Sequence, residues 1–390
     1  MLSSKTPTME YNFDLPIDRQ QTDSYKWDKY PEGVLPLWVA DMDFECAEPI
    51  KNSLQALVDR NLIGYSRVPD ALLETVLDRL ANRHNWEVQA EWITWLPGMV
   101  PGLHASSMAL GAGTYDIMTS SPVYRPFLEA AQRPNRRLID VPFLWKHNRW
   151  EMDFDTMEKS ITPETRLYML CNPHNPNGRM FDASELAQLG AFCQKHNLWI
   201  CADEIHCDLI IDSSKRHISI GTLSEDLANR TITLLAPSKT YNIAGLGCSM
   251  AVIPNPEIRK AFQDAIYGIL PHPNAFAHQA ALAAYRDSND WLDQVLTYLR
   301  GNHAYLLSEI NAITGLHMEP LEATYLAWIR IDPSLGSDFT QTLEKFGVGV
   351  QDAQVFGGNG YFRLNFATQR SLLEEAVKRI QQAVKSLLVV

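Results

Sequence analysis

Two charged residues each follow a short apolar run in the middle of the chain. Lys239 lies just after such a run in LLAPSKTYNIAGLG, and Asp203 ends the apolar run in LWICADEIHCDLII. A lysine becomes a nucleophile or base when its amine is partly buried and desolvated; the alternative is an ordinary exposed loop lysine. A buried carboxylate without a partner is costly. Asp203 therefore indicates a buried cation, such as a protonated pyridine nitrogen, or else a salt bridge or a helix cap.

Two loops with several prolines and glycines add polar groups of a different kind. CNPHNPNG (171–178) has two Asn-Pro steps and a closing glycine, which favour a tight turn. Asn175 could donate a hydrogen bond into a site there, or the segment could be only a strand-to-helix loop. PGMVPG (97–102) opens a helical pattern, and a helix N-terminus is a natural anion site. The amides of Met99 and Val100 are therefore candidate donors to an anion, and the Ser238 hydroxyl could add a further hydrogen bond.

The elements that must position these residues alternate in type. We expect helical patterns between short apolar strands at 92–96, 115–119, 166–170, 198–202, 231–235 and 249–253. Asp182 and Glu185 form a capping-box pattern at the start of one helix. Alternation of this kind predicts an α/β fold with a largely parallel sheet between helices. Ligands of such sheets lie at the carboxyl ends of the strands, where Asn175, Asp203 and Lys239 would converge.

The last hundred residues follow a different, α+β pattern. Residues 291–313 and 372–388 predict amphipathic helices, and residues 323–331 and 360–366 predict strands. We therefore expect a smaller second domain. The predicted boundaries are an N-terminal arm with part of the small domain at 1–47, a large domain at 48–288 and the small domain at 289–390.

Composition narrows the class of protein. The formal net charge of −12 argues against a nucleic-acid-binding face and a polybasic membrane anchor. No apolar run reaches the roughly 18 residues of a membrane span, and the N-terminus lacks the apolar stretch of a secretory signal. Six cysteines in 390 residues are too sparse for a disulfide scaffold. These features predict a cytoplasmic protein without nucleic-acid or membrane partners.

Together the motifs resemble those of the fold-type I pyridoxal-phosphate enzymes, the aspartate aminotransferase superfamily. NPHNPNG, DEIH and SKT occur in that family's order and spacing. Further segments are similar to its MalY/PatB branch of cystathionine β-lyase-like C–S lyases: PLWVADMDF, GYSR, SPVYRPF, DEIHCDL, SKTYNIAGL, TYLAW and FRLNFA. The resemblance implies a large domain with a mostly parallel seven-stranded sheet, a smaller α+β domain and pyridoxal 5′-phosphate as the cofactor.

The resemblance also implies roles around the cofactor. Lys239 would form the Schiff base and act as acid and base, and Asp203 would pair with the pyridine nitrogen. Asn175 would bond the phenolic oxygen, and the amides of Met99 and Val100 with the Ser238 hydroxyl would bind the phosphate. Tyr124 would stack on the ring, although it could also be a core aromatic. Tyr65 would reach the phosphate from a neighbouring subunit, which predicts a homodimer with its active site at the interface; a packed loop tyrosine is the alternative.

Substrate contacts follow from the same resemblance. Arg363 would bind the substrate carboxylate as a bidentate fork, unless it forms a structural salt bridge; Val39, Asn175 and Tyr124 would also contact the substrate. His206 stands at the cofactor where aminotransferases usually have Tyr, which agrees with the lyase branch. Ala236 replaces a hydroxyl residue that often binds phosphate, and Arg330, where relatives often have Asp, has no explanation at this level.

These roles predict α,β-elimination from cystathionine or a related cysteine S-conjugate, giving a thiol, pyruvate and ammonia. The alternatives are an aminotransferase, which shares the first half of the reaction, and a regulatory protein that kept the fold. No metal site is expected, because Cys201, His206 and Cys207 fit no common zinc spacing.

Overall fold

A seven-stranded sheet forms the centre of the large domain. The computed structural model describes residues 9–132 and 135–388. The strand order is β2-β10-β9-β8-β7-β3-β4, and only β10 is antiparallel to its neighbours. The strands are β2 (Ile93–Leu96), β3 (Tyr115–Thr119), β4 (Arg136–Asp140), β7 (Thr165–Cys171), β8 (Trp199–Asp203), β9 (Thr231–Leu235) and β10 (Ser249–Val252). The predicted mostly parallel sheet of seven strands is confirmed.

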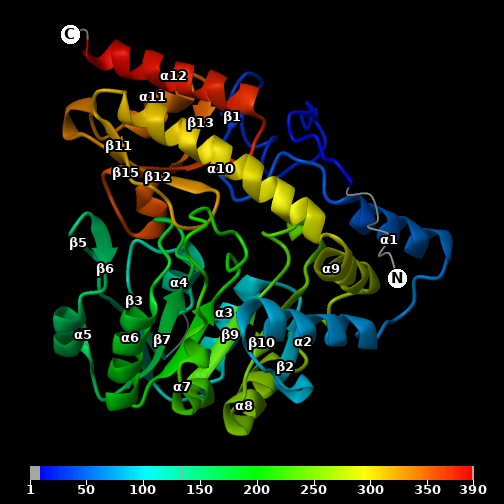
Figure 1. The fold of residues 1–390 in the computed structure, drawn as a ribbon. Helices are drawn as coiled ribbons and strands as arrows, with labels where there is room; N and C mark the ends of the chain where they lie inside the picture. Colours follow the sequence, from blue (N-terminus) through cyan, green and yellow to red (C-terminus); the bar gives the residue numbers. More distant parts are fainter. Residues whose placement is uncertain (1–8, 133–134, 389–390) are drawn as a thin grey trace.

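Helices cover both faces of this sheet because its inner strands are apolar on both sides. In β7, Leu167 and Met169 pack with one core, whereas Tyr168 and Leu170 pack with the other. The first core includes α3 (Met99–Met108), α4 (Arg125–Glu129) and α8 (Pro256–Ile266), and the second includes α5 (Phe154–Ser160), α6 (Ala183–Lys195) and α7 (Glu225–Arg230). Alternation of side chains along a strand produces this division. Figure 1 shows the resulting three layers.

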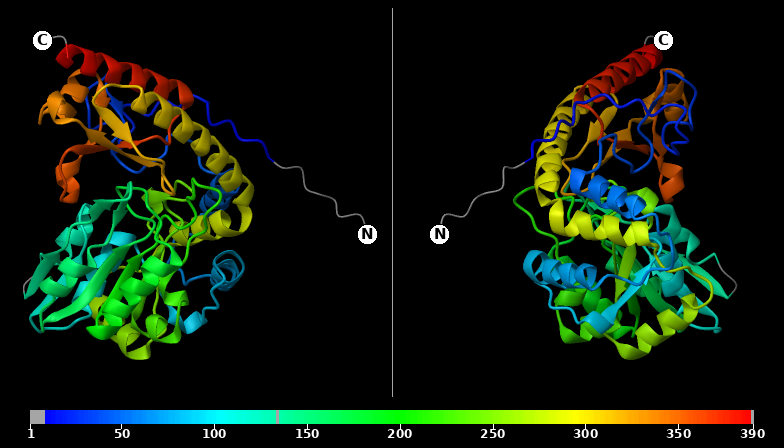
Figure 2. Two further views of the ribbon diagram at one scale, coloured as in Figure 1. Left: turned by 60° about the vertical axis from the view of Figure 1, so that its left-hand side comes forward. Right: turned by 90° about the vertical axis from the view of Figure 1, so that its right-hand side faces the viewer.

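The small domain is built on an antiparallel sheet of four strands. Its order is β11 (Leu316–Met318), β12 (Leu326–Ile331), β15 (Tyr361–Asn365) and β14 (Gln351–Asp352). Helices α10 (Asn289–Asn311), α11 (Phe339–Lys345) and α12 (Arg370–Leu388) belong to this end of the molecule, and α10 runs along one side in both views of Figure 2. Strand β1 (Leu35–Pro36) pairs in parallel with β13 (Val348–Gly349), which joins the N-terminal segment to this domain. The domain boundaries given above remain a prediction.

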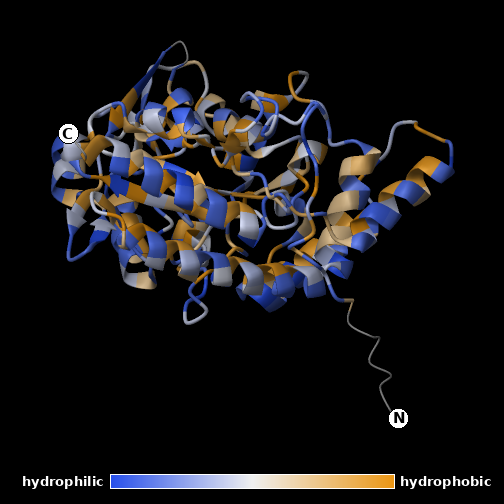
Figure 3. Ribbon diagram, turned by 90° about the horizontal axis from the view of Figure 1, so that it is seen from above, coloured by the Kyte–Doolittle hydropathy of each residue, from blue (hydrophilic) through white to orange (hydrophobic). Residues whose placement is uncertain are grey.

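Three further helices and a hairpin complete the fold. Helices α1 (Glu48–Asp59) and α2 (Asp70–His84) both pack on α9 (Ala275–Asp287). Strands β5 (Leu144–Lys146) and β6 (Arg149–Glu151) form a small hairpin of the large domain. Hydrophilic and hydrophobic residues alternate along the surface helices (Figure 3), as expected for helices that cover a core. Within the described residues, none of the helices combines the length and apolar character that a membrane crossing requires.

Candidate active site

A cavity of about 250 Å³ lies at the carboxyl ends of the central strands. Every site residue expected from the sequence lines it except Tyr65: Val39, Met99, Val100, Tyr124, Asn175, Asp203, His206, Ser238, Lys239 and Arg363. These residues come from both domains and from the N-terminal segment. The fold therefore brings together side chains that lie far apart in the sequence.

Lys239 supplies an amine that is easily deprotonated. Its Nζ donates a hydrogen bond of 2.6 Å to the carbonyl oxygen of Ala40. Loss of solvent lowers the pKa of Lys239 to about 8, with the positive charge of Arg363 adding to this and the charges of Asp41 and Asp203 opposing it. The amine is thus suited to act as a base or nucleophile near neutral pH, and it is not an ordinary exposed loop lysine.

Asp203 is a buried carboxylate without a counterion. Its side chain is 3% exposed, and Oδ1 accepts a hydrogen bond of 3.0 Å from the amide of Ile205. Among the described residues, no ion pair to Asp203 is found, so the salt-bridge alternative is wrong. Burial raises the pKa of Asp203 to about 7. A cation placed against this carboxylate would keep it ionised.

Arg363 offers a guanidinium to the cavity. Nη1 donates to Oδ1 of Asn175 at 2.8 Å, and Nη2 donates to the carbonyl of Trp38 at 2.8 Å, whereas Nε is buried without a partner. Burial lowers the pKa of Arg363 to about 10, so the group remains charged at neutral pH. Within residues 9–132 and 135–388 it has no acidic partner, which excludes the structural salt bridge. An uncompensated buried cation of this kind is suited to bind a carboxylate.

The start of helix α3 also lines the cavity. Helix α3 begins at Met99 without a side-chain cap, so its first amides, including those of Met99 and Val100, have no partner within the helix. Gly247 allows this loop to pack closely: its φ is +58°, and a Cβ there would lie 2.7 Å from the carbonyl oxygen of Pro97. Ser238 lines the same cavity, and Ala236 lines it without a hydroxyl.

Comparison with known proteins agrees with this geometry. The family described as aminotransferase class I and II matches residues 33–380. The chain is 35% identical to the cystathionine β-lyase PatB of Bacillus subtilis, over 96% of this chain and 100% of PatB. The chain belongs to the class I and II aminotransferase family.

Two solved structures of similar proteins extend the comparison. The match to the crystal structure of OvoB covers 96% of this chain and 100% of the OvoB chain, with 40% sequence identity and a TM-score of 0.94. The crystal structure of cystalysin from Treponema denticola contains pyridoxal 5′-phosphate. The match to it covers 97% of this chain and 100% of the cystalysin chain, with 30% sequence identity and a TM-score of 0.91. The fold is thus the fold-type I aminotransferase fold.

The donor set of this family member fits pyridoxal phosphate. Asp203 lacks a cation that a protonated pyridine nitrogen would supply, and the uncapped amides at the start of α3, which lines the same cavity, could bind a phosphate. Tyr124 begins α4, and its amide donates to the carbonyl of Asn175 at 3.0 Å. This bond links the main chains of two residues that both line the cavity.

His206 contributes an uncharged ring. The residue is buried, and burial together with the charges of Lys239 and Arg363 lowers its pKa to about 3. Its Nδ1 has no hydrogen-bond partner. A neutral imidazole next to the cavity can contact the cofactor without adding charge.

Tyr65 is the one expected site residue that does not line the cavity. It is fully exposed on the segment between α1 and α2, next to exposed Leu62 and Ile63. The alternative of a packed loop tyrosine is therefore wrong within a single chain. Its predicted contact with a neighbouring subunit stays a prediction.

Sequence reasoning missed the backbone groups of the segment Trp38–Asp41. The carbonyl oxygens of Trp38 and Ala40 bind Arg363 and Lys239, and those of Val39 and Asp41 accept from Asn365. Because every residue type carries a carbonyl, no sequence signal indicates such a role. Only the resemblance through PLWVADMDF drew attention to this segment.

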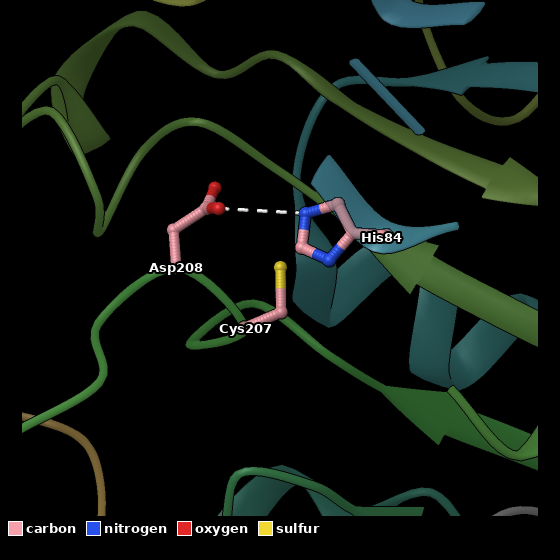
Figure 4. A group of neighbouring side chains, drawn as sticks. All are labelled: His84, Cys207 and Asp208. Atoms are coloured by element: carbon pink, nitrogen blue, oxygen red, sulfur yellow. Dashed lines mark ion pairs between the residues drawn. The ribbon is translucent and has the colours of Figure 1, made fainter. Parts of the chain in front are cut away.

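One group of possible metal ligands lies outside the cavity. His84, Cys207 and Asp208 approach one another (Figure 4). Arg79 and Arg83 already bind the Asp208 carboxylate at 2.8 and 2.7 Å, and burial raises the pKa of the Cys207 thiol well above its usual value. Two guanidinium groups and a protonated thiol disfavour a metal cation. The buried carboxylate is better explained as the counterion of the two arginines.

Proposed function

We propose that the protein is a pyridoxal-phosphate-dependent C–S lyase that cleaves cystathionine or another cysteine S-conjugate. The observation that carries the proposal is the arrangement of three charged residues around one cavity. Lys239 has an amine with a lowered pKa, Asp203 has a carboxylate without a cationic partner, and Arg363 has a guanidinium without an anionic partner. Similarity to the cystathionine β-lyase PatB supports the choice of reaction.

The chain's own residues would hold the cofactor at four points. Asp203 keeps the ring nitrogen protonated, the first amides of α3 and Ser238 bind the phosphate, and Tyr124 stacks on the ring. Asn175 bonds the phenolic oxygen while it also accepts from Arg363. When bound, pyridoxal phosphate supplies an electron sink for the electron pair left at the substrate Cα.

The same residues would then direct the elimination. Arg363 binds the substrate carboxylate, and Val39 contacts the substrate. Lys239 takes the proton from Cα, and the bond between Cβ and sulfur breaks. Lys239, or Tyr65 of a neighbouring subunit, returns a proton to the sulfur. The organic products are a thiol and an aminoacrylate, which water hydrolyses to pyruvate and ammonia.

The test is to supply L-cystathionine to the cofactor-loaded protein without any keto acid. We expect continuous release of pyruvate and ammonia, and the Lys239→Ala variant should release neither. Strict dependence on an added keto acid, with one turnover in its absence, would instead identify an aminotransferase. Asp203→Asn is a second variant, expected to bind the cofactor and to turn over slowly, because the ring nitrogen would lose its counterion.

The proposed assembly is a homodimer. Exposed apolar side chains occur in the connector between α1 and α2 and in the one between α8 and α9: Leu62 (79% exposed), Ile63 (77%), Tyr65, Tyr267 (88%) and Ile269 (65%). Clusters of large apolar side chains on a surface favour association. A second copy covering the first connector would bring Tyr65 next to another chain.

A cytoplasmic location is also proposed, because all six cysteines are free thiols.

A further inference from the structure

A second cavity, larger than the first, lies between the two domains. Its volume is about 550 Å³, within the range of small-molecule sites. The large domain contributes the β5–β6 hairpin and Gly178 of the CNPHNPNG loop, and the small domain contributes strands β11, β12 and β15. Figure 1 shows the hairpin below the small-domain sheet. We refer to this cavity as the interdomain cleft.

Aromatic side chains form much of the wall of the interdomain cleft. Trp145 and Trp150 of the hairpin lie 5.3 Å apart, and Trp150 lies 5.6 Å from Tyr361 of β15, measured between ring centroids. Tyr361 stacks on Trp328 of β12 at 5.2 Å. Trp145 is 41% exposed, so part of its surface is accessible to a ligand. Such rings favour a ligand that is itself planar and aromatic.

Two hydrogen-bond donors of the interdomain cleft lack an acceptor. Within the part of the chain that the structure describes, the exposed side chain of Arg330 makes no hydrogen bond and no ion pair, unlike the side chains of Arg149 and Arg179, which bind Glu185. The indole N–H of Trp328 is buried without a partner. Both groups can only donate, but only the exposed guanidinium of Arg330 can be reached from the cleft; because it carries a positive charge, it favours an anionic acceptor.

The acidic residues of the interdomain cleft already have partners. Glu322 pairs with Lys215 and Arg179, Glu319 binds the His317 ring at 2.7 Å, and Asp212 accepts from Ser214. Each of these carboxylates therefore has a hydrogen-bond or ion-pair partner within the protein. Arg330 remains the guanidinium of the cleft that is available to a ligand.

We propose that the interdomain cleft binds a small aromatic carboxylate, with its ring against Trp145, Trp150 and Tyr361 and its carboxylate on Arg330. Directly paired residues share a face of a sheet, and Trp328 pairs with Arg363 while Arg330 pairs with Tyr361. The interdomain cleft and the substrate guanidinium thus lie on the same face of the small-domain sheet. The site is separate from the active-site cavity, and the inference does not depend on the proposed reaction.

The experiment is isothermal titration calorimetry of the cofactor-loaded protein with phenylacetate. Acetate has the charge without the ring, and phenethylamine has the ring with the opposite charge; neither should bind. Arg330→Gln should weaken phenylacetate binding by about tenfold or more, as expected for loss of a charge-assisted hydrogen bond. Arg286→Gln, which removes an exposed arginine paired with Asp287 on α9, should leave binding unchanged.

Two further variants separate this site from the active site. Trp145→Leu removes an exposed ring and should also weaken binding, while its thermal melting curve checks that the chain still folds. Arg363→Gln should retain phenylacetate binding. If binding is lost in Arg363→Gln but kept in Arg330→Gln, the ligand occupies the substrate site and the inference is wrong. Equal binding of acetate, or no binding of phenylacetate, would also overturn it.

Discussion

At the scale of single residues, Asp203 carries an electrostatic cost that the cofactor-free protein cannot avoid. Burial raises its pKa from 3.8 to about 7. Between these pH values the folded protein holds a proton that the unfolded chain has released, so this group makes stability fall as pH rises from about 4 to 7, by up to about 1.4 kcal/mol per pH unit. Above pH 7 the loss is complete and this contribution becomes constant.

The first prediction follows from this fall in stability with rising pH. Cofactor-free Asp203→Asn should be more stable than the unaltered chain at pH 7, and the difference should shrink as pH falls toward 4, because the amide does not titrate. Denaturant unfolding at several pH values measures it. Asp208→Asn is the opposite control: that carboxylate is ionised between two arginines, so its loss should destabilise. A pH-independent effect of Asp203→Asn would contradict the argument.

Most of the side chains in the cavity could be predicted because their chemical type is unusual for their position. Lys239 and Asp203 stand out beside apolar runs, and Arg363 follows from the resemblance through FRLNFA. The partners that hold them could not be predicted in this way. The carbonyls of Ala40 and Trp38 reach Lys239 and Arg363 only through long-range folding, across sequence separations of 199 and 325 residues.

At the scale of elements, the loop before α3 depends on one close approach. Gly247 has φ +58°, and a Cβ added there would lie 2.7 Å from the carbonyl oxygen of Pro97. The second prediction is that Gly247→Ala displaces this loop, costs about 1–2 kcal/mol of stability from the left-handed backbone alone and weakens retention of pyridoxal phosphate. Equilibrium dialysis of the cofactor measures the effect.

A matched control lies two residues earlier. A Cβ at Gly245 would meet no atom within 4 Å, so Gly245→Ala should leave cofactor retention and stability nearly unchanged. If both variants lose the cofactor equally, the close contact between Gly247 and Pro97 is not the cause.

Element types were largely predictable because their periodic patterns are strong. Thr231–Leu235 and Tyr115–Thr119 form the expected strands, and Asp182 and Glu185 form the expected capping box. The β5–β6 hairpin was not predicted. Its strands have three residues each, too few to produce a period, and it packs through Trp150 on Tyr361 of the other domain. Consequently the interdomain cleft could not be foreseen either.

At the scale of the whole molecule, a homodimer with shared sites makes a third prediction. Tyr65→Phe and Lys239→Ala should each have low activity alone. If Tyr65 acts across the interface, dissociating and reassociating an equal mixture should give mixed dimers, each with one site that has both native residues. Roughly a quarter of native activity should return when chains pair at random. The measurement is pyruvate release from L-cystathionine before and after mixing.

The controls use the separate variants treated in the same way. Neither should gain activity when it is dissociated and reassociated alone. Absence of recovery in the mixture, with mixed dimers verified by mass spectrometry, would show that Tyr65 acts within its own chain or not at all.

The contacts of the segment Trp38–Asp41 have a consequence for evolution and for engineering. This segment holds Lys239, Arg363 and Asn365 through backbone carbonyl oxygens, which every amino acid provides. Val39 itself, in contrast, lines the cavity. Substitutions at Val39 can therefore reshape the space for a substrate while the groups that perform chemistry keep their supports, so this position is a starting point for changing substrate range by single mutations.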